Sequence, residues 1–371
     1  MTVRPTSEAL HERVRAFVLG TLSGAETEPF DDLALALARF QAAHVPALGR
    51  LVRARGLDLA SARDASVIPA LPCDVFRLAR IAVHPPEEDT LVFRTSGTSQ
   101  GREARGEHPF RTTATYELVA LRWGERMLWP DQEDLGVLVL APSVEEVSDS
   151  SLGFMLDRFA RELGGPASFH VRGGELDIEG LSRAAAEARA RGRSMLVLGA
   201  SFAFVHLLDG AGARDLTLPP GSRVMQTGGF KGRSREVEPA ELRRAIAATF
   251  GLPEAHVVGE YGMTELSSQL YEGTLAAALG VRAPARHGVY VSPPWMRVTA
   301  VDAATLAPLP PGETGILRFV DLANVDASVA IQTSDLGRVT AEGVELFGRA
   351  PGATPRGCSL AIDDVLARGS S

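Results

Sequence analysis

The sequence contains very little cysteine and almost no lysine. Two of its 371 residues are cysteines, Cys73 and Cys358, which is too few for a disulfide scaffold and favours a reducing compartment. Of the 38 basic residues, every one except Lys231 is an arginine. We interpret the arginine bias as an effect of codon usage. The lone lysine points to a position where a compact charge serves better than a planar one.

Long hydrophobic runs and an excess of positive charge are also absent. No apolar run approaches the ~20 residues that a membrane-spanning helix needs, and Met195–Leu208, the longest candidate, is interrupted by His206. Residues 1–20 lack the apolar core of a signal peptide. The net charge is −8, which disfavours binding to a nucleic-acid backbone. We expect a soluble, cytoplasmic protein with no membrane span and no nucleic-acid partner.

The remaining composition is that of a globular protein, with 45% hydrophobic and 23% charged residues. The length predicts two or three structural units. Residues 1–65 have helical periodicity, with Ser7 and either Asp31 or Asp32 as candidate caps. The helices expected there are 8–19, 31–44 and 45–55.

From residue 66 to 285, apolar strands alternate with helices, which is the pattern of an open, mostly parallel α/β sheet. The strands expected are 91–94, 135–141, 167–171, 194–198, 223–227 and 256–259. The helices expected are 112–129, 151–163, 178–191, 202–208 and 239–250.

Residues 286–350 predict a smaller β-rich subdomain, because short strands are separated by proline and glycine turns. The strands expected in this subdomain are 288–291, 296–301, 314–320, 330–332, 338–340 and 344–347. Residues 351–371 form a tail that contains Cys358 and a short expected helix at 360–366.

Four segments carry candidate chemistry, and the first follows the strand at 91–94. It reads TSGTSQGR from Thr95 to Arg102. Glycines allow backbone N–H groups to turn inward around an anion, while hydroxyls and an arginine add donors to phosphate. The segment therefore indicates a loop that binds a polyphosphate, and the alternative is a solvated serine and glycine loop. It does not have the GxxxxGK[ST] pattern of a Walker loop.

The second segment, Gly259–Glu265, reads GEYGMTE and also follows an apolar strand. Tyr261 can stack on a planar base, Thr264 can donate to a phosphate, and Glu265 can hold Mg²⁺ through carboxylate oxygen. The alternative is a strand-to-helix loop with Thr264 or Glu265 near an N-cap.

The third and fourth segments are shorter. Gln226–Arg233 (QTGGFKGR) has paired glycines that permit close approach of a flat ligand, and a tight turn is the alternative. Thr333–Arg338 (TSDLGR) places Asp335 where it can accept both hydroxyls of a ribose, and an Asx-type turn is the alternative. Arg349 follows in the sequence FGR.

In this order, the four segments resemble the adenylate-forming superfamily of acyl-CoA ligases and related enzymes. Within it, other stretches are similar to the acyl-protein synthetases of bacterial bioluminescence, the LuxE family of long-chain-fatty-acid–protein ligases. These stretches read PCDVFR, SLGFMLDRF, TGGFKGRSRE, GEYGMTELSSQLY and RGCSL. The resemblance covers most of the chain. It implies an α/β adenylating fold with ATP and Mg²⁺ as cofactors.

The resemblance also implies a role for each matching residue. Gly228 and Gly229 would border the adenine under Tyr261, and Asp335 and Arg349 would hold the ribose. Thr264 would touch the α-phosphate and Glu265 would hold Mg²⁺, while Cys358 would be the acyl-accepting cysteine. The residues that would cradle the triphosphate are Thr95, Ser96, Gly97, Thr98, Ser99, Gly101 and Arg102.

Two departures from the superfamily pattern stand out. Arg102 replaces the usual lysine of the phosphate loop. Typical members continue past a hinge near Arg349 into a mobile domain with a catalytic lysine, whereas here 22 residues follow, none of them lysine. We therefore expect the usual mobile C-terminal domain to be missing, and Lys231 to supply the lysine that steadies the reacting phosphate.

The implied reaction activates a carboxylic acid, which the resemblance implies is a fatty acid, as an acyl-adenylate. The acyl group then passes to Cys358 and on to a partner such as an acyl reductase. Candidate residues of the acid pocket are Ser151, Ser201, Phe202 and Phe230. Cys73 is assigned to the core, and for Cys358 a buried structural role is the alternative.

Two other functions compete with this one. The first is an adenylating ligase that passes the acyl group directly to CoA, a carrier protein or an amine, with Cys358 inert. The second is a nucleotide-binding subunit that regulates a partner and is not an enzyme. The full set of phosphate, ribose and Mg²⁺ residues disfavours the second.

Overall fold

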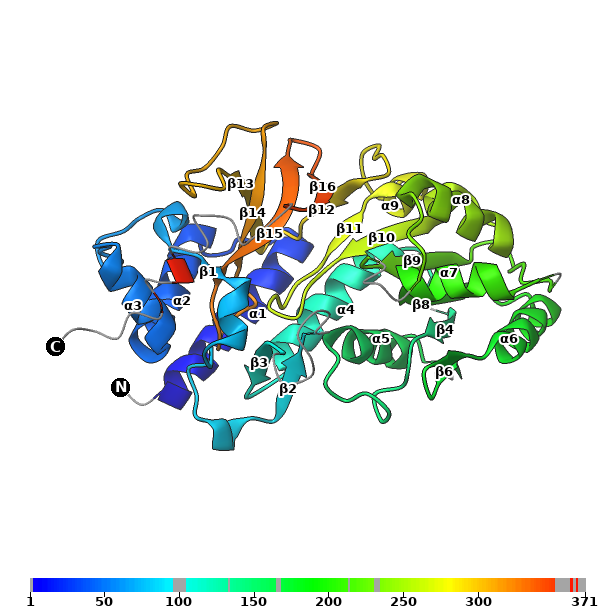
Figure 1. The fold of residues 1–371 in the computed structure, drawn as a ribbon, viewed down its shortest axis with the longest axis horizontal. Helices are drawn as coiled ribbons and strands as arrows, with labels where there is room; N and C mark the ends of the chain where they lie inside the picture. Colours follow the sequence, from blue (N-terminus) through cyan, green and yellow to red (C-terminus); the bar gives the residue numbers. More distant parts are fainter. Residues whose placement is uncertain are drawn as a thin grey trace. The chain divides into compact units, whose positions relative to one another are not determined.

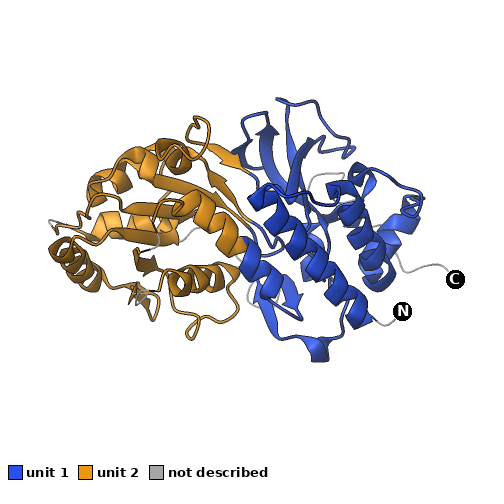
Figure 2. Cartoon of the chain, turned by 180° about the vertical axis from the view of Figure 1, so that it is seen from behind, with its two compact units in different colours: residues 1–119, 263–268, 292–371 blue, residues 120–262, 269–291 orange. Residues whose placement is uncertain are grey.

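The computed structural model describes residues 3–95, 105–132, 134–164, 168–212, 214–229, 234–350, 361, 362 and 365. The chain forms two compact units (Figure 2). Unit 1 comprises residues 1–119, 263–268 and 292–371, and unit 2 comprises residues 120–262 and 269–291. None of the helices in the described part of the chain is both long and apolar enough to cross a bilayer.

Unit 2 contains a sheet in the order β12–β11–β10–β9–β8–β4–β5. The strands from β10 to β5 are parallel to their neighbours, whereas β11 and β12 are antiparallel additions at one side. Their bounds are β4 Gly136–Leu140, β5 Ser168–Phe169, β8 Met195–Ala200, β9 Arg223–Thr227, β10 Val257–Tyr261, β11 Leu270–Glu272 and β12 Val289–Val291. This mostly parallel sheet confirms the predicted fold class.

Helices cover both faces of this sheet, with α7 and α8 on one side and α5 on the other (Figure 1). The helices are α4 Ala114–Leu128, which begins in unit 1, and α5 Ser151–Glu162, α6 Ile178–Arg191, α7 Ser201–Gly210, α8 Pro239–Phe250 and α9 Thr274–Ala278. A short hairpin, β6 Val171–Arg172 with β7 Glu175–Leu176, precedes α6, and the 3₁₀ turn η5 Glu254–His256 precedes β10.

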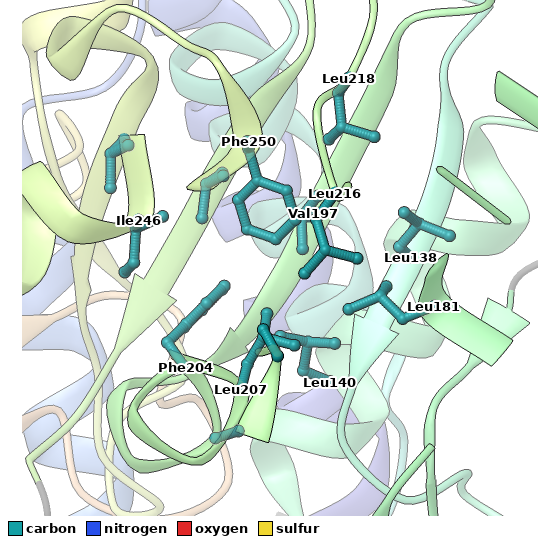
Figure 3. Packing of buried hydrophobic residues seen from close by; sticks show 14 of the residues in the cluster. Leu138, Leu140, Leu181, Val197, Phe204, Leu207, Leu216, Leu218, Ile246 and Phe250 are labelled. Carbon is teal, nitrogen blue, oxygen red and sulfur yellow. The ribbon is translucent and has the colours of Figure 1, made fainter. Parts of the chain in front are cut away.

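The core of unit 2 lies between the strands and the helices α6, α7 and α8 (Figure 3). Leu138 and Leu140 point from β4 into this cluster, because alternate residues of a strand share a face. Phe204 of α7 is fully buried there. A Cβ at Gly199 would lie 2.9 Å from Leu140 Cβ and 3.1 Å from Phe204, so glycine permits the close packing of α7 on β8.

Local signals fix the helix ends where the sequence analysis placed them. At the start of α6 the Asp177 carboxylate accepts from the Gly180 N–H at 2.7 Å, and the helix ends at Gly192 with φ 64°. At the start of α8 the Glu238 carboxylate caps the helix, and Gly251 ends it with φ 67°. The predicted bounds 178–191 and 239–250 are therefore confirmed.

Unit 1 contains an antiparallel sheet in the order β13–β14–β15–β16, with the short β1 parallel to β15. A separate hairpin is formed by β2 and β3. The strands are β1 Leu71–Pro72, β2 Leu91–Arg94, β3 Glu107–Phe110, β13 Met296–Val301, β14 Thr314–Asp321, β15 Ala330–Val339 and β16 Val344–Arg349. The helices are α1 Val3–Ser23, α2 Phe30–His44 and α3 Pro46–Ala54, and the 3₁₀ turns are η1 Ala65–Val67, η2 Cys73–Arg77 and η3 Pro86–Glu88.

The predicted caps of the first two helices are wrong. Ser7 lies inside α1, where its buried hydroxyl donates to the Asp326 carboxylate at 2.5 Å. The N-cap position of α2 is Pro29, and Asp31 instead accepts from the Ala65 N–H at 2.9 Å. Both polar side chains bind distant partners in unit 1, which local capping rules do not take into account.

The strands predicted at 330–332 and 338–340 are one strand, β15, of ten residues. Polar residues and Gly337 in its middle imitate a turn, but β14 and β16 supply hydrogen-bonding partners on both sides. The strands β3 and β11 were not predicted, because each has only three or four residues and lacks clear alternation.

We predict that Phe204→Ala lowers the free energy of unfolding of unit 2 by about 3–5 kcal/mol, because it removes a fully buried ring and leaves a cavity. Urea denaturation followed by circular dichroism measures the change. The control is Val281→Ala, where a side chain that is 42% exposed is shortened in the same unit. Equal effects of the two substitutions would contradict the packing shown in Figure 3.

Candidate active site

The GEYGMTE segment ends in a turn that crosses from one unit to the other. Tyr261 is the last residue of β10 in unit 2, and residues 263–268 belong to unit 1. The turn is closed by the Leu266 N–H, which donates to the Met263 carbonyl at 3.1 Å. No helix begins in residues 262–269, all of which are described, so the N-cap alternative for Thr264 and Glu265 is wrong.

A buried carboxylate anchors the end of this turn. Asp321, at the end of β14, is fully buried and accepts from the Ser267 N–H at 3.0 Å and the Ser268 N–H at 2.9 Å. It also accepts from the Ser268 hydroxyl at 2.8 Å, and this hydroxyl accepts from the Trp295 indole at 3.0 Å. Burial raises the pKa of Asp321 to about 6, although its hydrogen bonds oppose the shift.

Two further side chains form hydrogen bonds with the backbone carbonyls of Thr264 and Glu265. His108 Nδ1 lies 2.7 Å from the Thr264 carbonyl oxygen. The Asn324 amide donates to the Glu265 carbonyl oxygen at 2.9 Å and to the Ser328 carbonyl at 3.0 Å. The backbone of Thr264 and Glu265 is therefore fixed by buried partners from β3 and from the loop after β14.

Glu265 lies in an electrostatic neighbourhood that contains the predicted ribose residues. The pKa of Glu265 is raised to about 7, mainly by burial and in smaller part by the charges of Asp74 and Asp335, whereas Arg349 opposes the rise. Arg349 Nε lies 3.5 Å from Asp335 Oδ1, and the two residues are opposite each other on β15 and β16. The Asx-turn alternative for Asp335 is wrong, because Asp335 lies within β15.

Cys73 at the start of η2 belongs to the same neighbourhood. Burial and the negative charges of Glu265, Asp74 and Asp335 raise the pKa of the Cys73 thiol well above its usual range, and Arg349 lowers it. The thiol is therefore held in its protonated form at neutral pH. Cys73 was predicted to be a core residue, and the structure places its thiol near these charged side chains.

The donor set is compatible with a magnesium ion that also binds a nucleotide. Mg²⁺ commonly takes one or two protein carboxylates, with phosphate and water oxygens completing its octahedron. The Glu265 side chain is buried and its pKa is raised, so a nearby cation would stabilise its ionised form. In the described part of the chain, no three His, Cys, Asp or Glu side chains are grouped as a complete protein-only metal site.

Thr95 and Gly106 form the stem of the predicted phosphate loop, and two hydrogen bonds join them. The Thr95 N–H donates to the Gly106 carbonyl at 2.9 Å, and the Gly106 N–H donates to the Thr95 hydroxyl at 2.9 Å. The Arg105 side chain donates to the Arg94 carbonyl at 3.0 Å. Outside the described residues lie the other predicted members of this loop, Ser96, Gly97, Thr98, Ser99, Gly101 and Arg102.

The predicted adenine and acid residues belong to unit 2. Gly228 has φ 70°, which favours glycine at the end of β9. The Ser201 hydroxyl, predicted to line the acid pocket, donates to the Gly228 carbonyl at 2.7 Å. Phe202 packs at the edge of the core, and Ser151 begins α5. Gly229 follows Gly228, and the predicted residues Phe230, Lys231 and Cys358 lie outside the described residues.

Sequence reasoning missed His108, Asn324 and Asp321, which support the site but do not carry a recognisable motif. The sequence positions of Asp321 and Asn324 could have marked them as candidates, because polar residues at the end of an apolar strand often face a site. His108 gave no signal beyond its place two residues after Gly106.

The sequence matches the family model "Acyl-protein synthetase, LuxE" over residues 58–367. A long-chain-fatty-acid–luciferin-component ligase of Vibrio harveyi is 24% identical over 322 residues, covering 82% of this chain and 79% of the relative. The protein of the same name from Aliivibrio fischeri is 22% identical over 317 residues, covering 81% and 79% of the two chains.

The fold is shared with solved adenylate-forming enzymes. A 2-hydroxyisobutyryl-CoA ligase in complex with its acyl-AMP and CoA has a TM-score of 0.62 at 14% identity, covering 88% of this chain and 76% of that one. ATP-bound MatB from Rhodopseudomonas palustris has a TM-score of 0.51 at 15% identity. This likeness covers 72% of the present chain and about half of MatB, 49%. At such identities the solved structures show the fold alone, and it is the family match over most of the chain that places the protein among the acyl-protein synthetases of the LuxE family, which are ligases.

Proposed function

We propose that this acyl-protein synthetase activates a long-chain fatty acid with ATP and transfers the acyl group, through Cys358, to a partner protein. The fatty acid is inferred from the names of the two Vibrionaceae relatives. The partner is an acyl reductase or a carrier protein that accepts the acyl group as a thioester or ester.

The observation that carries the proposal is the convergence of motif residues in unit 1. Glu265 lies about 70 positions of sequence before Asp335 on β15 and about 80 before Arg349 on β16. The charges of Asp335 and Arg349 nevertheless shift the pKa of Glu265, and all three residues shift the pKa of Cys73. A carboxylate with a raised pKa beside an arginine and a second carboxylate is a suitable site for a magnesium nucleotide.

In the first half-reaction, a carboxylate oxygen of the acid attacks the α-phosphorus of ATP, and the bond to the bridging oxygen of pyrophosphate breaks. Thr264 donates to the α-phosphate, and Asp335 accepts from the ribose hydroxyls with Arg349 beside it. Lys231 and Arg102 add positive charge near the phosphates. These groups act by positioning and by stabilising charge that develops in the transition state.

Glu265 would hold Mg²⁺, which supplies charge neutralisation for the phosphate oxygens when it is bound. The chain contributes a carboxylate whose backbone is fixed through its carbonyl by Asn324. Because burial disfavours the ionised carboxylate in the free protein, Glu265 is prepared for a cation that makes ionisation favourable.

In the second half-reaction, a cysteine thiolate attacks the carbonyl carbon of the acyl-adenylate, and AMP leaves with the electron pair of the broken bond. Cys358 is the proposed nucleophile, in keeping with its match to the acyl-accepting cysteine of the family. Cys73 is a poor nucleophile, because burial and nearby carboxylates keep its thiol protonated.

We predict that Cys358→Ser abolishes formation of a hydroxylamine-sensitive acyl thioester but leaves acid-dependent ATP–pyrophosphate exchange intact. The reason is that adenylation precedes the thiol step and does not need the cysteine. Exchange with a panel of fatty acids, together with intact-mass measurement after incubation with ATP, tests both halves. Fatty acids of long chain should support the fastest exchange.

The matched control is Cys73→Ser, which changes the other cysteine and should still give the thioester. Loss of the thioester in Cys73→Ser alone would transfer the nucleophile to Cys73. Full acyl transfer to CoA or to an amine by Cys358→Ser would instead favour the direct ligase, and no exchange with any acid would contradict the proposed function.

We predict that Glu265→Gln lowers the kcat of pyrophosphate exchange by about 100-fold, because a charged group that acts on the phosphates is lost. The same substitution should stabilise the fold at pH 8. Glu265 has a pKa raised from 4.5 to about 7 in the folded protein, so the wild type loses stability as pH rises through this window. Glutamine is not subject to that loss.

The stability difference should reach about 3 kcal/mol at pH 8 and vanish near pH 4. Chemical denaturation at several pH values measures it. Glu313→Gln, which changes an exposed glutamate of the same unit, should alter neither exchange nor the pH dependence. A Glu265→Gln protein with normal exchange would remove Glu265 from the metal role.

A further inference from the structure

His108 is a buried residue whose ring forms a hydrogen bond with the Thr264 carbonyl. It lies on β3 and is 2% exposed. Its ring packs edge-on against Phe76 of η2, with centroids 5.7 Å apart, and lies tilted against the ring of Phe110, with centroids 4.4 Å apart. These contacts fix the ring plane, and therefore the direction in which Nδ1 points.

The hydrogen bond from His108 requires one tautomer. The acceptor is a carbonyl oxygen, so Nδ1 must carry the proton in the 2.7 Å contact with Thr264. Burial lowers the pKa of His108 to about 4, and the ring is neutral at pH 7. The neutral ring then has a single N–H, and the Thr264 carbonyl accepts it.

His108 lies on the β2–β3 hairpin, which leads directly into the stem of the predicted phosphate loop. On the β2–β3 hairpin His108 is opposite Phe93, and the next pair along the ladder is Arg94 with Glu107. Beyond that pair, Thr95 and Gly106 close the stem with two backbone N–H hydrogen bonds. A Cβ at Gly106 would lie 3.3 Å from Arg77 and 3.4 Å from Phe76, so the stem packs closely on η2.

We propose that His108 is a positioning residue that holds Thr264 and Glu265 in register with the stem of the phosphate loop. The ring is set by β3 and η2, and its N–H fixes the carbonyl of Thr264. About 160 residues of sequence separate the two predicted nucleotide-binding motifs, and this hydrogen bond joins Thr264 to the strand that follows the phosphate loop. The catalytic consequence rests on the proposed function, but the positioning itself does not.

The donor and the packing of His108 can be tested separately. His108→Phe keeps a ring against Phe76 and Phe110 but removes the N–H donor. His108→Asn removes the ring but places an amide N–H the same number of bonds from the backbone as Nδ1. Phe110→Leu is the matched control, because it disturbs the packing of the same cluster and leaves the donor unchanged.

The first measurement is hydrogen–deuterium exchange of the peptide that covers residues 263–268. In His108→Phe we expect the protected amides of this segment to exchange about tenfold faster or more, because the Thr264 carbonyl is left without its donor. His108→Asn and Phe110→Leu should keep the exchange of this segment near the wild-type rate, even where their Tm values fall.

The second measurement is the kcat of pyrophosphate exchange, made well below the Tm of the least stable variant. A displacement of Thr264 and Glu265 of about 1 Å should lower kcat about 100-fold in His108→Phe. The KM for the acid should change little. His108→Asn should recover most of kcat although its Tm is lower, so that activity and stability rank the two variants in opposite order.

The proposal is overturned if His108→Phe leaves the exchange of residues 263–268 unchanged, or if kcat follows Tm across all three variants. Failure of the proposed function has a different signature, because wild-type protein would then show no acid-dependent pyrophosphate exchange. In that case the deuterium measurement still decides whether His108 positions the segment.

Discussion

The burial of Asp321 is the constraint on which the candidate site depends. A carboxylate with no access to water is unfavourable unless its oxygens are hydrogen-bonded, and here two N–H groups and one hydroxyl of residues 267 and 268 satisfy them. A further bond comes from the Ala323 N–H at 3.0 Å. The turn that carries Thr264 and Glu265 is thereby tied to the end of β14, and breaking the tie would remove three of these four hydrogen bonds from a buried carboxylate.

Much of the fold could be predicted because its signals are local. The helices 178–191 and 239–250 end at residues whose side chain or φ angle stops a helix, and the strand 223–227 is followed by the paired glycines Gly228 and Gly229. β15 was divided in error, because its polar residues and Gly337 have the composition of a turn. The strand is maintained by its two neighbours, and a single sequence does not show which segments become neighbours.

The candidate site could be predicted only to the extent that its motifs are contiguous. Glu265, Asp335 and Arg349 were predicted as site residues from such motifs, and the structure places them in one electrostatic neighbourhood. His108 and Asn324 act through backbone carbonyls, which every residue possesses, so no residue type at the receiving end marks them. Of the charged side chains that act on Cys73, Asp74 is adjacent in sequence, whereas Glu265 and Asp335 are distant, so the sequence alone did not place them beside this cysteine.

The N-terminal helices contribute to the support of the site more than the family match would indicate. Fully buried Gln41 of α2 donates to the carbonyls of Asn324 at 2.7 Å and Val325 at 2.8 Å, and it accepts from the Val329 N–H at 2.8 Å. The family match starts at residue 58. In a chain trimmed to residues 58–367, three main-chain groups of the loop beside Glu265 would lose Gln41 as their hydrogen-bonding partner, so α2 acts as scaffolding for a loop inside the matched segment.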